Sequence, residues 1–206
     1  MNSKTKKKVK IIAIAFIVIL VPLAYYLSIV IAIDDLNREM EKCVFNNQTD
    51  SITNVALDKT RWVIFLMPWN NYARNNEINL LWKLKDYNGA LHAAHENSEV
   101  NPTGMNYTVE GMAYEYLGEF EKAKPLYDKA IAIYEMEFKE KPNDDFLISE
   151  IALLSMVVGD SVRAQEVVAS RIDSEDEVTN EQLKRVNHQI LQHKSGGVLD
   201  FVNSKN

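Results

Sequence analysis

One long apolar run near the amino terminus constrains this chain more than any other feature. Residues 11–33 are 23 consecutive positions without a charge, interrupted only by Pro22, two tyrosines and a serine. A helix of this length reaches roughly 34 Å at about 1.5 Å per residue, which exceeds a hydrocarbon core of about 30 Å. Neighbouring groups in a spanning helix can satisfy the carbonyl that Pro22 frees. We therefore predict a single membrane-spanning helix over residues 11–33.

The charges that flank this run predict its orientation. Residues 1–10 carry five lysines and no acid, whereas Asp34 and Asp35 follow the run directly. By the positive-inside rule, residues 1–10 stay in the cytoplasm and the rest of the chain projects outside. A cleaved signal peptide is the competing interpretation, because Val30–Ala32 ends in a small residue. The apolar core of a signal peptide usually has about 7–15 residues, so we favour an uncleaved anchor in a bacterial inner membrane with a periplasmic domain.

Composition narrows the class of the exported part. The chain has 206 residues, enough for one domain and an appendage, and its 7 glycines and 5 prolines without alternating apolar runs favour an all-α fold over a β-sandwich. Five of its 23 basic residues precede the anchor, which leaves 18 against 29 acidic residues, a net charge of −11. This charge repels nucleic acid. The single cysteine, Cys43, excludes an intrachain disulfide, and it either links two copies into a homodimer or has no role.

The juxtamembrane part, residues 34–70, contains three kinds of sequence. Residues 34–43 read as a polar extension of the anchor helix, and residues 44–53 read as a linker. Residues 62–69 then form an apolar stretch too short to span a bilayer. Three interpretations of this stretch compete: a helix buried against the following repeat, an interfacial segment with two tryptophans at headgroup level, and a buried strand. We favour the buried helix.

A phrase that ends in alanine recurs from residue 85 onward. Its copies are residues 85–90 (KDYNGA), 118–123 (GEFEKA) and 159–164 (GDSVRA), so the alanines are 33 and 41 positions apart. Each copy reads as a short turn between two antiparallel helices, and the alanine lies where the second helix approaches the first closely. The pattern predicts about three helix hairpins.

The middle copy has the clearest pattern. Tyr107, Gly111 and Tyr114 lie on one face of its first helix. Gly111 costs a helix about 1 kcal/mol relative to alanine, which predicts a tight crossing at this point. The matching stripe of the second helix is Ala123, Tyr127, Ala130 and Ile131.

These residues resemble the tetratricopeptide repeat (TPR) family. The middle copy supplies Tyr107, Gly111, Tyr114, Gly118, Ala123, Tyr127 and Ala130, and departs from the family at Glu110, where leucine is usual, and at Glu135, where proline is usual. The second helix is therefore expected to continue towards Pro142. The first copy keeps Leu81, Tyr87, Ala90, Ala94 and Pro102 with Arg74 at the bulky position. The third keeps Ile148, Ile151, Ala152, Gly159, Ala164 and Val168 with Arg171 at a small one.

The resemblance implies a short TPR-like α-solenoid after the transmembrane helix. A capping helix is predicted from Thr179, with Leu183, Val186, Ile190 and Leu191 on one stripe, ending near Gly196. The predicted repeat domain is residues 71–195, followed by a tail, residues 196–206.

Catalytic and metal-binding patterns are weak in this sequence. His92 and His95 are three residues apart on a predicted helix, but they lack the spacing of zinc protease helices, and we expect both to face outward. The acidic stretch 173–177 lacks the alternating ligands and glycine of a calcium loop. We predict no catalytic residue, no metal and no cofactor, and hence no enzyme; a metal enzyme built on His92 and His95 is the weakest alternative.

The TPR resemblance also implies a partner-binding surface on the first helix of each repeat. We predict nine principal contact residues, rich in aromatics and methionine as suits an apolar or extended peptide: Tyr72, Asn79, Trp82, Met105, Met112, Tyr116, Phe146, Leu153 and Met156. The corresponding positions of lesser weight are Asn75, Lys83, Thr108, Glu115, Ser149 and Val157. Packing of Trp82, Leu153 and Met156 against the capping helix or residues 62–69 is the alternative.

Together these features predict a membrane-anchored protein-interaction module. The expected role is that of a scaffold, adaptor or assembly factor for envelope proteins, with a protein or peptide partner and a lipid bilayer around the anchor. An immunity protein that neutralises a basic toxin in the periplasm is the alternative, because its negative charge would suit such a partner.

Overall fold

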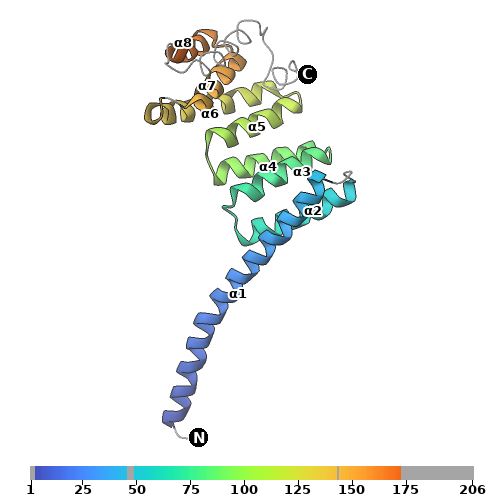
Figure 1. The fold of residues 1–206 in the computed structure, drawn as a ribbon, viewed down its shortest axis with the longest axis vertical. Helices are drawn as coiled ribbons and strands as arrows, with labels where there is room; N and C mark the ends of the chain where they lie inside the picture. The colour runs from blue at the N-terminus through green and yellow to red at the C-terminus, as the bar shows by residue number, and fades with distance from the viewer. Residues whose placement is uncertain (1–2, 46–48, 143, 173–206) are drawn as a thin grey trace. The chain divides into compact units, whose positions relative to one another are not determined.

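The computed structural model describes residues 3–45, 49–142 and 144–172, and within these ranges it has eight α-helices and no β-strand (Figure 1). The predicted all-α fold, an apolar amino-terminal helix followed by helix hairpins, is confirmed. The predicted capping helix, the acidic stretch 173–177 and the tail lie outside the described residues. The helices are α1 (Ser3–Phe45), α2 (Asp50–Leu66), α3 (Asn71–Lys83), α4 (Tyr87–Val100), α5 (Gly104–Tyr116), α6 (Phe120–Glu140), α7 (Asp145–Val158) and α8 (Ser161–Ile172).

Internal contacts divide the chain into two compact units, Met1–Leu84 and Lys85–Asn206. Helices α1 to α3 belong to the first unit and α4 to α8 to the second. Helix α3, predicted as the start of the repeat domain, thus falls in the first unit. The domain boundaries inferred from the sequence, after residues 10, 33, 70 and 195, remain predictions.

In the first unit, α2 runs antiparallel to the carboxyl-terminal half of α1. The Cys43 thiol lies 3.9 Å from the Ile52 carbonyl oxygen, Lys59 pairs with Asp35 at 3.2 Å, and the Tyr25 hydroxyl donates to the Leu66 carbonyl at 2.5 Å. The core between the helices consists of Ala32, Leu36, Val63, Leu66 and Ala73. The structure thereby shortens the predicted linker 44–53, since α1 continues to Phe45 and α2 already begins at Asp50.

The apolar stretch 62–69 is helical as far as Leu66, and its burial is only partial. Val63 and Leu66 are buried against α1 and the start of α3, whereas Trp62, Phe65 and Trp69 are exposed. The favoured interpretation, a helix buried against the first repeat, is therefore right for one face of the helix and wrong for the other.

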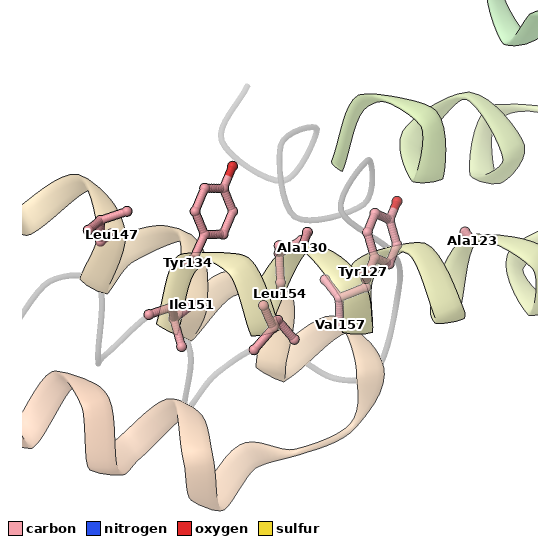
Figure 2. Packing of buried hydrophobic residues seen from close by; sticks show 9 residues of the cluster. Ala123, Tyr127, Ala130, Tyr134, Leu147, Ile151, Leu154 and Val157 are labelled. Carbon is pink, nitrogen blue, oxygen red and sulfur yellow. The ribbon is translucent and has the colours of Figure 1, made fainter. Parts of the chain in front are cut away.

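In the second unit, each helix packs on the next one along the chain, from α4 to α8. Among the described residues, the main core cluster joins α6 and α7 and includes Tyr127, Ile131, Leu147, Ile151 and Leu154. Figure 2 shows Tyr127 and Tyr134 projecting from one side of α6, with Ile151, Leu154 and Val157 of α7 on the other side. This order of contacts is that of consecutive helix hairpins.

Local sequence signals set most helix boundaries in the repeats. An Asn, Asp or Thr side chain caps the first turn at Asn70, Asp86, Thr103, Asp144 and Asp160. At the other ends, Gly118 and Gly159 have φ angles of 77° and 94°, which favour glycine. Helix α6 runs past Glu135 to Glu140, as the missing proline predicted, and this longer helix accounts for the wider second repeat interval.

Gly111 makes the close helix crossing that the sequence predicts. A Cβ atom at this position would lie 2.8 Å from Cδ1 and 3.0 Å from Cζ of Tyr127, a side chain with no exposed surface. The Tyr127 hydroxyl donates to Glu115 at 2.6 Å, which holds the ring in place. Burial, with a smaller contribution from Glu115, raises the pKa of Tyr127 well above its usual range. The missing side chain of Gly111 is therefore what allows α5 and α6 to pack around this ring.

Candidate partner-binding surface

The nine predicted contact residues lie on three helices in two units. Tyr72, Asn79 and Trp82 are on α3 in the first unit. The others are on α5 and α7 in the second unit: Met105, Met112, Tyr116, Phe146, Leu153 and Met156.

On α3 the predicted residues follow one face at helical spacing. Tyr72 and Asn79 are exposed, and Trp82 is half-buried. The adjacent Lys83 donates to the Cys43 carbonyl oxygen at 3.2 Å, so the end of α3 is attached to α1. The α3 face therefore offers an exposed aromatic at its start and a partly covered one at its end.

On α5 the predicted residues include a fixed aromatic side chain. Tyr116 is exposed, its hydroxyl donates to the Tyr87 hydroxyl at 3.2 Å, and the two ring centroids are 4.4 Å apart. The hydrogen bond with Tyr87 is the largest cause of a raised pKa at Tyr116. Met105 is also exposed, whereas Met112 is half-buried against the main core cluster. Met105 and Tyr116 thus remain available on the same face of the helix.

On α7 the exposed contact residue is Phe146. Its ring lies edge-on to that of Tyr134, with the centroids 6.1 Å apart and an interplanar angle of 89°. Leu153 packs against the main core cluster, and Met156 packs against the cluster of Ile148, Ala152, Ala164 and Val168. Leu153 and Met156 therefore pack within the repeats, and the capping helix of the alternative lies outside the described residues.

Two positions of lesser weight do not reach the surface. Thr108 and Val157 are both buried. The Thr108 hydroxyl donates to the Gly104 carbonyl at 3.0 Å, and Val157 belongs to the main core cluster. Glu115 accepts a hydrogen bond from Tyr127, and the Ser149 hydroxyl donates to the Asp145 carbonyl at 2.8 Å. The prediction of a contact role is thus wrong for Thr108 and Val157.

Tyr134 connects the starts of α5 and α7, and sequence reasoning did not single it out. The ring is almost fully buried, and a Cβ atom at Gly104 would lie 2.7 Å from its Cζ. Since Phe146 touches the same ring, Gly104 of α5 and Phe146 of α7 contact Tyr134 from two different helices. Desolvation by burial raises the pKa of Tyr134 beyond that of a free phenol. Tyr134 lies seven residues after Tyr127, two helical turns along the same face, and this spacing was the sequence signal that could have identified it.

A polar network occupies the contact between α4 and α5. Glu110 is buried, with one oxygen 2.8 Å from His95 Nδ1 and the other accepting from Ser98 at 2.5 Å. Asn97 donates to Asn106 in the same contact at 3.2 Å. This network explains the departure from leucine at Glu110. It gives His95 a structural partner, while His92 pairs with Glu96 on the surface at 3.4 Å.

The described residues contain no group of three or more His, Cys, Asp or Glu side chains that could hold a metal ion. A hollow of about 600 Å³ lies at the α6–α7 turn and includes Phe146, Asp144, Asp145 and Lys141 in its lining. A second, of about 360 Å³, lies between α6, α7 and α8 beside the ion pair of Arg163 and Glu135. The first hollow adjoins the predicted surface and extends it beyond Phe146.

Comparisons with known proteins add a weak structural likeness. No protein-family model and no curated protein sequence matches this chain. Among solved structures, the crystal structure of MamA superposes with a TM-score of 0.47 at 16% sequence identity, covering 94% of this chain and 99% of that chain. A likeness at this score carries no argument about function, so the TPR-like fold rests on the helix hairpins described above.

Proposed function

We propose that this chain is a membrane-anchored interaction module that binds a protein or peptide through the first helices of its hairpins. The observation that carries the proposal is the set of large apolar side chains left exposed on α5 and α7. Met105, Tyr116 and Phe146 are 42%, 49% and 48% exposed although each is joined to a well-packed helix pair. Aromatic and methionine side chains held in fixed positions are the usual anchors of protein interfaces.

The proposed anchor is α1. Among the described residues, one helix is long and apolar enough to cross a bilayer by length and composition, Val18–Cys43, with a mean hydropathy of 1.9. Only 6% of its most apolar window is buried inside the protein, and Val18, Ile19 and Val21 are all more than half exposed. Lipid is the environment in which such exposure is favourable. The basic residues 1–10 then lie in the cytoplasm of a bacterium and the repeats in the periplasm.

In this proposal the module brings envelope proteins together near the inner membrane as a scaffold, adaptor or assembly factor. The occupant of the α5 and α7 surface is an apolar or extended peptide segment of a partner. The chain binds and does not catalyse, and Phe146, Tyr116 and Met105 carry most of the affinity. Replacing a central aromatic anchor by alanine costs about 2 kcal/mol of binding free energy, roughly a 30-fold loss of affinity.

Site-specific photocrosslinking in intact cells tests the proposed surface. A photoreactive amino acid at position 105, 116 or 146 should capture the same partner, because these positions line one surface. Met136 and Val162 are matched controls, since they are 59% and 65% exposed but lie on second helices. Equal capture of that partner at positions 136 and 162 would contradict the proposal.

The immunity alternative rests on one observation, the net charge of −11 beyond the first ten residues. A negative surface steers association with a basic toxin. Co-expression with a neighbouring toxin-like reading frame should restore growth if this role holds. Growth inhibition that the chain does not relieve would remove it.

A further inference from the structure

An exposed aromatic cluster lies where α2 turns into α3. Trp62, Phe65, Trp69 and Tyr72 are 51%, 71%, 62% and 55% exposed. Trp62 and Phe65 stack with their ring centroids 5.4 Å apart and 20° between their planes. Residues 62–73 contain no charged side chain, so no charged group in this segment favours contact with bulk water. We call residues 62–73 the aromatic turn.

The contacts between α1 and α2 set the depth of the aromatic turn along the proposed membrane helix. Lys59 of α2 pairs with Asp35 of α1. At the carboxyl-terminal end of α2, the Leu66 carbonyl oxygen accepts a hydrogen bond from the Tyr25 hydroxyl. Ten residues of helix separate Asp35 from Tyr25, or about 15 Å. The aromatic turn therefore lies beside the uncharged run of α1, where Leu27, Val30 and Ile31 are also exposed.

The exposed charged groups end at a similar level on the three helices of this unit, because Arg74, which lies beyond that level on α3, is only 7% exposed. Asp35 with Lys59, and Arg61 with Glu77 at 2.8 Å, form two ion pairs at the upper limit of the aromatic turn. The uncharged stretches of α1 and of the aromatic turn both begin beyond these pairs. A common boundary between charged and uncharged surface is what a membrane interface requires.

The backbone of the aromatic turn is satisfied from within the protein. The carbonyl oxygens of Leu66, Met67 and Pro68 accept from the Tyr25 hydroxyl, the Asn70 amide and Arg74 Nε at 2.5, 2.9 and 2.6 Å. The Asn70 carbonyl accepts from the Arg74 amide at 3.1 Å. Arg74 is itself 7% exposed, so its charge is withdrawn from the surface. A turn in water needs no such partners, whereas one in contact with lipid does.

We propose that the aromatic turn is a second membrane contact, in which Trp62, Phe65, Trp69 and Tyr72 insert into the outer leaflet of the bilayer, from the headgroup boundary inward. This inference rests on the proposed spanning role of α1. Tryptophan and tyrosine favour this boundary because one part of each ring system is apolar and another is polar. The contact holds the first unit against the outer face of the bilayer, because α2 and α3 are attached to α1 at the bilayer surface. Tyr72 then serves lipid binding, while the partner surface remains on α5 and α7.

Tryptophan fluorescence of the full chain in lipid vesicles tests the inference. The chain has three tryptophans, so three single-tryptophan variants can be made by replacing the other two with phenylalanine. Trp62 and Trp69 are the test positions. Trp82 is the matched control. Its neighbour Lys83 contacts Cys43, which lies near the carboxyl-terminal end of α1, whereas the aromatic turn contacts Tyr25 further back along the helix. The vesicles contain phosphatidylethanolamine and phosphatidylglycerol, with or without a lipid brominated near the top of its acyl chains.

The expected result is that the brominated lipid removes most of the emission of Trp62 and Trp69 and leaves that of Trp82 unchanged. Aqueous iodide should quench Trp82 several-fold more than Trp69. If iodide quenches Trp62 and Trp69 and the brominated lipid does not, the aromatic turn lies in water and the inference is overturned. If neither reagent reaches them, a second copy of the chain covers the aromatic turn, which also overturns it.

Flotation of the same vesicles separates this inference from the anchor itself. A chain that floats with lipid after alkaline washing, yet shows no lipid quenching at Trp62 and Trp69, retains its anchor and loses the aromatic contact. A chain that fails to float refutes the spanning role of α1 and, with it, the second contact.

Discussion

Replacing Gly111 by alanine tests whether the hairpin packing of α5 on α6 is as tight as the structure shows. By helix propensity alone the change stabilises α5 by about 1 kcal/mol. The new Cβ, however, would overlap the ring of Tyr127, which has no exposed surface and whose hydroxyl is bonded to Glu115. The ring cannot rotate away without leaving the core.

The expected net effect of Gly111→Ala is a loss of about 2 kcal/mol. Forcing one extra carbon into a packed core costs about 1–3 kcal/mol, and weakening the Tyr127–Glu115 hydrogen bond adds about 1 kcal/mol, against the helix gain. For a chain of this size the loss corresponds to a fall of roughly 4–8 °C in Tm. Thermal unfolding of the full chain in detergent, followed by circular dichroism and by hydrogen exchange of α5 and α6, measures it.

The same substitution in a Tyr127→Ala chain provides a second test, because the sign of its effect on stability should reverse there. Tyr127→Ala alone costs about 3–5 kcal/mol because it leaves a cavity beside Gly111. In that background Gly111→Ala should stabilise by about 1 kcal/mol, since only the propensity term remains. Ala132→Gly on the exposed face of α6 controls for propensity and should cost about 1 kcal/mol. If Gly111→Ala stabilises the parent chain, or has the same sign in both backgrounds, the close crossing is refuted.

Three further predictions follow from single residues. Burial raises the pKa of the Glu150 carboxyl, so folding takes up a proton there, and the free energy of unfolding falls as pH rises from about 4 through the raised pKa. Glu150→Gln should therefore stabilise the chain at pH 7 and not at pH 4. Chemical denaturation measures this, and equal effects at both pH values would contradict it. Lys85 has a φ angle of 60°, so Lys85→Gly should raise stability by about 0.5–1 kcal/mol in the same assay, and a loss would show that the turn is not strained. Glu110→Ala should lower the free energy of unfolding by about 2–3 kcal/mol, because it breaks the buried network with His95 and Ser98. Glu110→Leu fills the same space and should lower it less. The reverse order would show that the network rather than packing dominates.

The repeat region was predictable from sequence because its signals are local. Gly118 and Gly159 end helices, Asp86 and Asp160 start them, and Gly111 marks a close crossing, each through its own backbone or nearest turn. These features depend on residues a few positions apart. They could therefore be read without knowing the fold.

Helix α2 was harder to predict because its stability comes from contact with α1. Its first turns (DSITN) are polar and resemble a linker, yet Thr53, Ala56 and Leu57 are buried. The choice of a buried helix for residues 62–69 was wrong in part for the same reason. An apolar run gives no sign of which of its sides packs against protein and which stays exposed.

The TPR resemblance supplied the candidate surface, and its role in binding remains a prediction. The resemblance selected Met105, Tyr116 and Phe146, and the structure leaves these three side chains exposed. It buries Thr108 and Val157, and it brings Tyr134 between the starts of α5 and α7. Those outcomes depend on how neighbouring hairpins meet, which spacing within one helix does not specify.

The location of the repeats relative to the bilayer is the claim on which the proposed function depends. A reporter enzyme that is active only outside the cytoplasm, fused after Asn206 of the full chain, tests it most directly. The account predicts high reporter activity in intact cells, and loss of that activity when four of the five lysines of residues 4–10 are moved to positions 34–37. An inactive reporter on the unaltered chain, with the fusion intact and bound to the membrane, would place the repeats in the cytoplasm and contradict the account.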